Sequence, residues 1–149
     1  MNVNDVAAAV SKIQHAYAQA VLVRDLQAFM RLYDAKVRVF DAWGIWQYEG
    51  GPAWEGAVDG WFKSLGTECV KVTFEDTQAY GSSECACATA IVSYSAQTPG
   101  GEALRTLQNR ITWGLRTTGH VLRILHEHTS SPVGFEDMKA ILQRPGVGS

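Results

Sequence analysis

Asp41 and Tyr17 are the residues whose types and spacing most directly suggest chemistry. Asp41 ends the short alternating run 37–41, and Tyr17 lies upstream in a segment with helical spacing of apolar residues. An acid at a strand end and a phenol on the preceding helix can face one apolar pocket. There the acid can take up a proton while the phenol stabilises the negative charge that develops on a ketone oxygen. The pair predicts proton-transfer chemistry and leaves the substrate open.

Both residues also have purely structural interpretations. An aspartate at this position can accept the backbone amides of Trp43 or Gly44 and cap the loop that follows the strand. Tyr17 lies on the apolar stripe of its helix, so ordinary core packing with its hydroxyl at a pocket wall accounts for it equally well. Catalysis and capping are both compatible with the spacing, and the sequence leaves the choice open.

Tryptophans cluster directly after Asp41. Trp43, Trp46 and Trp54 lie close together in the sequence, and Trp61 follows on the same predicted helix as Trp54. We expect these four to form one wall of the pocket and to contact substrate. They can act as a lid over a flat apolar ligand, or they can fill the open end of the pocket.

The segment 121–130 carries His126 and His128 at alternate positions, in register with Leu122 and Ile124. We expect His126 to be a catalytic acid or hydrogen-bond donor near neutral pH and His128 to contact the substrate. With Asp41 the two could form a two-His, one-carboxylate metal site. Because a His-x-His pair alone is weak evidence for a metal, we predict neither a metal nor a cofactor. The simpler alternative has Glu127 in solvent and one histidine bonded to a buried carbonyl.

Helical spacing in the first half and alternation in the second half predict an α+β domain. Glycine-containing turns separate the later strands, so the sheet is mostly antiparallel. A strongly curved sheet with helices across its concave face would enclose a pocket. The expected elements are helices at 5–23, 26 to about 34, 52–65 and 135–142, and strands at 37–41, 70–80, 84–97, 103–116 and 121–130.

Composition excludes several classes of protein. The 149 residues carry 13 basic and 15 acidic side chains that form no runs. The sequence therefore lacks the clustered basic residues that are typical of a nucleic-acid-binding protein. Three cysteines and an N-terminus without signal-peptide features predict a cytoplasmic protein. No apolar stretch approaches the ~20 residues that span a bilayer, so we expect no membrane association. One domain, 1–149, is expected, with its core at about 5–133 and a tail at 134–149.

Three local segments resemble one known family. Residues 24–33, which begin Arg24-Asp25, resemble its second helix, and residues 39–44, which contain Asp41, resemble the strand end that holds a catalytic acid. Residues 122–130 are similar to its closing strand. In this order they resemble the ketosteroid isomerase-like superfamily, also called SnoaL-like or NTF2-like. The resemblance implies a cone-shaped, cystatin-like fold whose last strand faces the pocket, and a homodimer formed through the sheet.

The resemblance also implies roles for individual residues. Asp41 matches the isomerase's general base, and Tyr17 matches the phenol that donates to the substrate oxygen. The isomerase has a second donor, a protonated acid on its penultimate strand. Here Ile111 matches that position, with Asn109 one pleat away on the same face. Because loss of one such donor typically costs ~10²–10³ in rate, the departure argues against a true steroid isomerase.

The sequence therefore predicts a small enzyme of the isomerase, lyase or cyclase type that acts on an apolar small molecule. Asp41 would take a proton from carbon next to a carbonyl group, and Tyr17, aided by Asn109 or His126, would bind the resulting oxyanion. The alternative is a non-catalytic module that binds an apolar ligand or serves oligomerisation. In that case Asp41 is fully engaged with backbone amides.

Overall fold

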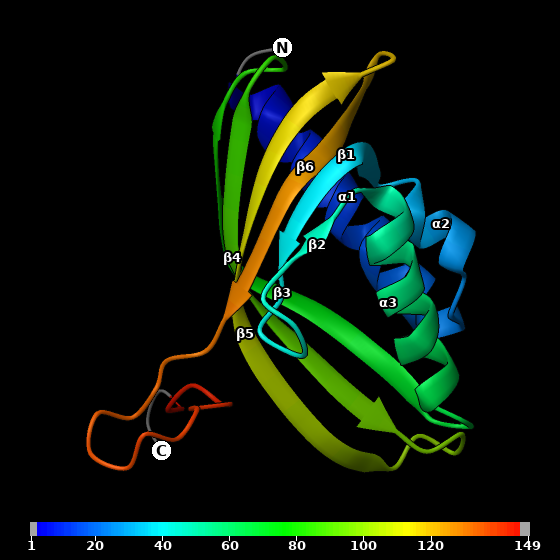
Figure 1. The fold of residues 1–149 in the computed structure, drawn as a ribbon, viewed down its shortest axis with the longest axis vertical. Helices are drawn as coiled ribbons and strands as arrows, with labels where there is room; N and C mark the ends of the chain where they lie inside the picture. The colour runs from blue at the N-terminus through cyan, green and yellow to red at the C-terminus, as the bar shows by residue number, and fades with distance from the viewer. Residues whose placement is uncertain (1–2, 147–149) are drawn as a thin grey trace.

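A computed structural model of the chain describes residues 3–146, so both ends of the predicted 1–149 domain lie outside the described part. Helices lie on the concave face of one curved six-stranded sheet, which confirms the predicted α+β class (Figure 1). The elements are α1 (Val3–Val23), α2 (Leu26–Met30), β1 (Tyr33–Phe40), β2 (Tyr48–Glu49), α3 (Gly51–Ser64), β3 (Cys69–Gly81), β4 (Ala86–Gln97), β5 (Ala103–Thr118) and β6 (Val121–Ser130).

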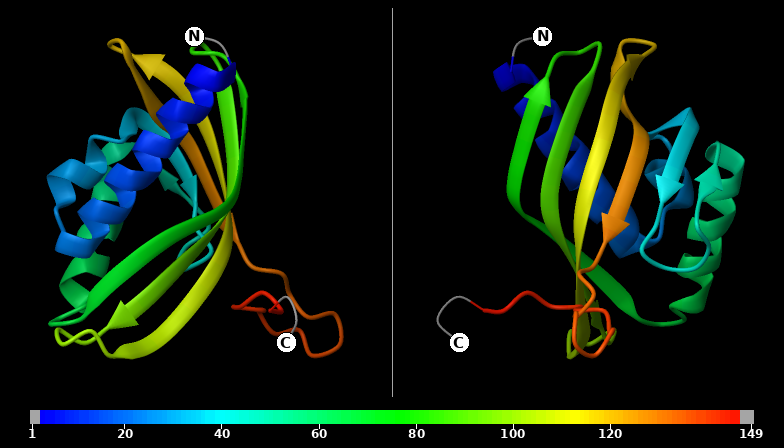
Figure 2. Two further views of the ribbon diagram at one scale, coloured as in Figure 1. Left: turned by 180° about the vertical axis from the view of Figure 1, so that it is seen from behind. Right: turned by 60° about the vertical axis from the view of Figure 1, so that its left-hand side comes forward.

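The strand order is β2-β1-β6-β5-β4-β3, and only the β1–β6 pair is parallel. The long strands β3 to β6 follow one another as hairpins, as the turn residues predict. Between β5 and β6, Gly119 and His120 both have positive φ (57° and 68°), the backbone of a two-residue turn that matches the sheet's twist. The sheet curls around the helices, as Figure 2 shows from two further sides.

The first helix forms because apolar residues recur every three or four positions along it. Val6, Val10 and Tyr17 are buried on the face that packs over β3. The helix ends where Arg24 adopts a positive φ of 54°, and the Asp25 carboxylate then caps α2 by accepting the Ala28 amide at 3.0 Å. The break predicted at this dipeptide is confirmed, and beyond it Phe29 of α2 packs against Tyr17 with ring centroids 4.8 Å apart.

The strand β1 begins at Tyr33, earlier than the predicted 37–41, and α2 is correspondingly shorter than predicted. Asp34 is buried and its carboxylate accepts hydrogen bonds from Arg116 and Thr118 of β5. These bonds, led by the one from Arg116, hold the pKa of Asp34 well below its usual range. Because these partners lie across the sheet, residues 33 and 34 extend toward them instead of continuing a helix.

A β-bulge interrupts the regular pairing of β5 with β6. Leu115 pairs with Ile124, whereas its neighbour Gly114 pairs with His126, so Leu125 is an extra residue on β6. The extra residue shifts the alternation of side chains between the two faces. Ile124 is buried on the inner face before the bulge, and Glu127 is buried on that face after it.

The C-terminal segment is not a helix, so the helix predicted at 135–142 is wrong. A β-bridge joins Val133 to Ala140, and the Gln108 amide donates to the Leu142 carbonyl at 2.7 Å. Phe135 is 95% exposed. An eight-residue amphipathic segment gains too little from its own hydrogen bonds to form a helix when its apolar side chains have no surface to bury against. Among the described residues, no helix has the length and apolar character needed to cross a membrane.

Candidate functional site

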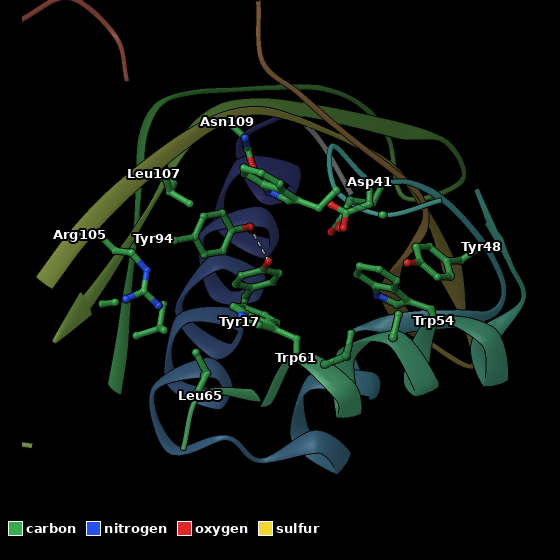
Figure 3. Close-up of a pocket in the computed structure, with 17 residues that line it drawn as sticks. Tyr17, Asp41, Tyr48, Trp54, Trp61, Leu65, Tyr94, Arg105, Leu107 and Asn109 are labelled. Carbon is green, nitrogen blue, oxygen red and sulfur yellow. Dashed lines mark hydrogen bonds between the residues drawn. The ribbon is translucent and has the colours of Figure 1, made fainter. Parts of the chain in front are cut away.

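A cavity of about 410 Å³ lies between the helices and the inner face of the sheet (Figure 3). This volume falls in the range of about 300–1,000 Å³ that is usual for small-molecule sites. Aromatic and aliphatic side chains form most of its wall, with a few polar groups among them. The lining residues are Tyr17, Asp41, Trp43, Gly44, Tyr48, Trp54, Ala57, Val58, Trp61, Leu65, Val70, Tyr94, Ala96, Arg105, Leu107, Asn109 and Glu127.

Asp41 is half-buried on this wall, directly after β1. The Thr129 hydroxyl donates to Asp41 Oδ1 at 2.8 Å and accepts the Ala42 amide, also at 2.8 Å. Burial raises the pKa of the Asp41 carboxyl, while hydrogen bonds from Thr129 and from the Ala42 and Trp43 amides oppose the rise. The result is a carboxylate that is positioned by its neighbours and is more basic than an exposed aspartate.

Tyr17 projects from α1 into the cavity, where its hydroxyl lies 2.8 Å from that of Tyr94 on β4 (Figure 3). Either hydroxyl can donate to the other, so one proton of the pair remains for a third group. Burial raises the pKa of both phenols well above the usual value, which keeps them neutral and able to donate. The two hydroxyls face Asp41 across the cavity, and the charge of Asp41 contributes to the raised pKa of Tyr94 (Figure 3).

Glu127 is a second carboxyl group of the cavity, and it is only 2% exposed. Its Oε1 accepts the Tyr33 hydroxyl at 2.7 Å and the Trp113 indole N–H at 2.9 Å. Burial raises the pKa of Glu127 to about 7, in spite of these two donors, and the charge of Asp41 adds to the rise. A carboxyl group that titrates near neutral pH can act as acid or base.

Three of the four tryptophans expected in the wall line the cavity: Trp43, Trp54 and Trp61. The expectation for Trp46 is wrong, because this side chain is 94% exposed on the loop that leads to β2. The cavity is not filled by tryptophans. The Trp54 indole Nε1 is fully buried and interacts with the Tyr33 hydroxyl, where it partly opposes the burial that raises the pKa of that phenol.

His126 and His128 do not line the cavity, so their expected placement in the pocket is wrong. Both rings pack against Phe40 on the outer face of the sheet, with centroid distances of 5.0 and 5.5 Å, and His126 Nδ1 lies 2.7 Å from the Arg38 carbonyl oxygen. The bulge at Leu125 is the physical reason, because it moves both histidines to the outer face. The solvent-exposed position suggested for Glu127 is wrong for the same reason.

Of the two β5 residues predicted to contact substrate, only Asn109 lines the cavity. Its Nδ2 donates to the Gln108 carbonyl at 3.0 Å and to Ser131 Oγ at 3.1 Å, and its Oδ1 points toward the cavity (Figure 3). Asn109 is therefore arranged to accept a hydrogen bond rather than to stabilise an oxyanion. Ile111 is buried farther along β5, beneath α1, and its expected contact with substrate is wrong.

Sequence reasoning missed Tyr94, Tyr48 and Glu127. Tyr94 is the only large residue among the inward positions of β4, where small side chains otherwise alternate, and that contrast was a usable signal. The adjacent apolar pair Ile124-Leu125 breaks the alternation of β6 and was the available sign of the bulge. The inward position of Glu127 follows directly from that bulge.

The structure also separates the residues proposed as metal ligands. Asp41 lies on the inner face of the sheet, whereas His126 and His128 lie on the outer face, so the three cannot bind one ion. Across residues 3–146, no group of three or more His, Cys, Asp or Glu side chains is arranged to bind a metal.

Comparisons with known proteins agree on the fold. The family model of the SnoaL-like domain matches residues 10–134. An NTF2-like protein of unknown function from Pseudomonas putida superposes with a TM-score of 0.82 at 20% identity, covering 98% of this chain and 99% of that chain. The protein Aln2 from a Streptomyces species gives a TM-score of 0.76 at 11% identity, covering 87% of this chain and 93% of that chain.

An uncharacterised protein with a cystatin-like fold from Caulobacter vibrioides gives a TM-score of 0.66 at 17% identity, covering 85% of this chain and 89% of that chain. No curated protein matches the sequence. The identities are too low to carry an activity across, but the family model spans most of the chain. The chain therefore belongs to the SnoaL-like domain family and has its NTF2-like, cystatin-like fold.

Proposed function

We propose that this protein is a small proton-transfer enzyme of the isomerase, lyase or cyclase type that acts on an apolar cyclic carbonyl compound. One observation carries the proposal: a basic carboxylate, Asp41, and a neutral phenol pair, Tyr17 and Tyr94, line the same apolar cavity. An acid-base group and an oxyanion donor in a site shielded from water are the two requirements for removing a proton next to a carbonyl.

The proposed reaction uses the groups in sequence. The ligand lies against Trp54 and Trp61, with its carbonyl oxygen near the phenol pair and the adjacent carbon near Asp41. Asp41 takes the proton from that carbon, and the negative charge moves onto the oxygen. The hydroxyl of the Tyr17–Tyr94 pair that is free to donate forms a hydrogen bond to this oxygen. Asp41 then returns the proton that it took, either to the same carbon or to another one.

Exchange of carbon-bound protons tests this step without knowledge of the natural substrate. We expect the protein to catalyse the replacement of the protons next to the carbonyl of α-tetralone by deuterium in D₂O, followed by NMR. Asp41→Asn keeps the shape of the side chain but cannot take up the proton. Because general base catalysis typically contributes 10²–10⁴, the exchange rate should fall by about 10²-fold or more.

The hydrocarbon tetralin, which has no carbonyl group, is the matched ligand for checking the cavity. Both proteins should bind it equally, as measured by quenching of tryptophan fluorescence. Equal exchange rates in wild type and Asp41→Asn would contradict the proposal.

The second candidate is a binding module without catalysis. It is favoured by the engagement of Asp41 with Thr129 and with the amides of Ala42 and Trp43, the arrangement expected of a capping residue. In this case α-tetralone and tetralin bind to wild type and Asp41→Asn alike, and neither protein catalyses exchange.

A further inference from the structure

Glu127 has no part in the reaction as set out above, yet it is the most deeply buried carboxyl group of the cavity wall. Its position depends on the bulge at Leu125, which turns it inward. A buried acid is costly unless its polar atoms are satisfied or used. The inference that follows rests on the proposed function and concerns the second group that this function needs.

The hydrogen bonds of Glu127 are one-sided. The Tyr33 hydroxyl and the Trp113 indole N–H both donate to Oε1, at 2.7 and 2.9 Å. Neither bond involves Oε2, and no described residue donates to that oxygen. Because Oε1 is already an acceptor twice, a proton on this carboxyl group belongs on Oε2. The neutral acid therefore has one free O–H donor in the cavity wall.

The charges around Glu127 favour its neutral form. Asp41 adds negative charge, and every phenol near Glu127 stays neutral because burial raises its pKa; no cation contributes to the pKa of Glu127. Asp41 has more stabilising donors than Glu127 and less burial, so Asp41 is the group that ionises first. The groups that face Glu127 come from several parts of the fold. They are Tyr33 of β1, Asp41 directly after β1, Tyr17 of α1, Tyr94 of β4 and Trp113 of β5.

Trp54 contributes no second donor here. Its Nε1 is fully buried and interacts with the hydroxyl of Tyr33, the residue that donates to Glu127, and the two rings lie 6.1 Å apart. The donor that this wall offers to a ligand oxygen is therefore the free O–H of Glu127.

We propose that Glu127 is a second catalytic residue, whose neutral carboxyl group donates from Oε2 to the carbonyl oxygen of the ligand and transfers its proton there. In the step, the C–H bond next to the carbonyl breaks, and its proton goes to Asp41. The electron pair moves through the carbonyl to oxygen, which takes the proton of Glu127. Asp41 is then neutral, Glu127 is ionised, and the ligand is a neutral enol. The reverse transfers restore both groups.

Ligand binding, rather than turnover, tests this assignment, so its failure is distinct from a failure of the proposed function. A carbonyl oxygen can only accept, so α-tetralone should bind to the protein with neutral Glu127. Between about pH 5 and about pH 9, its affinity for wild type should fall on the order of tenfold, the equivalent of one lost hydrogen bond. We call this fall in affinity with rising pH the step. Tetralin, which has no carbonyl group, should bind without it.

Two variants assign the step to one carboxyl group. Glu127→Gln can still accept from Tyr33 and donate into the cavity at any pH, so its α-tetralone affinity should be independent of pH. Asp41→Asn should retain the step, displaced to lower pH because the Asp41 charge raises the pKa of Glu127. A step that persists in Glu127→Gln, or a wild-type protein that binds α-tetralone without a step or not at all, would overturn the proposal.

A further variant guards against misfolding of Glu127→Gln, which loss of tetralin binding would reveal. Tyr33→Phe removes a donor that stabilises ionised Glu127, so the step should move to higher pH. A step that does not move in Tyr33→Phe contradicts the assignment.

Discussion

Asp41 and Glu127 are two carboxyl groups on one cavity wall with different surroundings. Asp41 is half-buried and receives a hydroxyl and backbone amides, whereas Glu127 is fully enclosed and receives two donors on one oxygen. Different surroundings separate the pKa values of two acids, and such a separation assigns one as base and the other as acid. At the residue scale the function depends on this difference.

The burial of Glu127 also has a consequence for stability. In the unfolded chain this side chain loses its proton near pH 4.5, and in the folded protein near pH 7. Between these values the folded state binds the proton more tightly, so the free energy of unfolding falls as the pH rises from about 4.5 to about 7. With about 1.4 kcal/mol for each pKa unit, the loss should be on the order of 2 to 3 kcal/mol.

Urea unfolding at about pH 5 and about pH 8 measures this loss. Glu127→Gln has no proton to lose, so its free energy of unfolding should change much less between the two pH values than that of wild type. The assignment of the pKa is wrong if both proteins lose the same amount.

At the residue scale, the sequence predicts where some side chains lie and fails for others, and the reasons are physical. Asp41 and Tyr17 occupy regular positions of a strand and a helix, so periodicity alone directs both toward one space. Glu127 lies just beyond a bulge. Simple alternation therefore places Glu127 on the outer face and His126 and His128 on the inner face, the reverse of the observed arrangement. Polar partners such as Tyr33 and Trp113 come from other strands, and their distances appear only in the folded structure.

Among the elements, α3 determines the shape of the cavity, because Trp54 and Trp61 project from it. Its interior contains Gly56 and Gly60, and a Cβ added at either position meets no atom within 4 Å. Glycine in a helix is less stable than alanine by roughly 0.5–1 kcal/mol. Gly56→Ala and Gly60→Ala should each raise the free energy of unfolding by about that amount, as measured by urea unfolding.

Gly44 in the loop after β1 provides the opposite case. Its φ is +83°, and an added Cβ would lie 3.1 Å from the Tyr48 hydroxyl oxygen. Gly44→Ala should therefore lower the free energy of unfolding by about 1 kcal/mol or more. Stabilisation by this variant, or destabilisation by the two helix variants, would show that the local backbone differs from the one described.

The elements were predictable where one face is buried and regular. The four long strands and α1 have such faces, and the structure has them close to their expected bounds. The start of β1 and the tail were not predictable, because Asp34 is satisfied by partners on β5 and because Phe135 finds no surface to bury against. Contacts distant in sequence decide both cases.

For the whole molecule, helices cover the concave face of the curved sheet (Figures 1 and 2). The cavity lies on this inner side, and His126 and His128 pack against Phe40 on the outer side. The C-terminal segment pairs with β5 at Gln108. A cone of this kind follows from the order of elements, but an open volume of about 410 Å³ depends on which side chains fill it. The homodimer that the family resemblance implies stays a prediction.

The central claim is that this cavity pairs a carboxylate base with a neutral carboxylic acid. The pH dependence of α-tetralone proton exchange tests it most directly, since both groups must be in the correct state at once. The rate should rise as Asp41 ionises and fall above about pH 7 as Glu127 loses its proton. In Glu127→Gln the fall should disappear. A wild-type rate that keeps rising through neutral into alkaline pH would contradict the account.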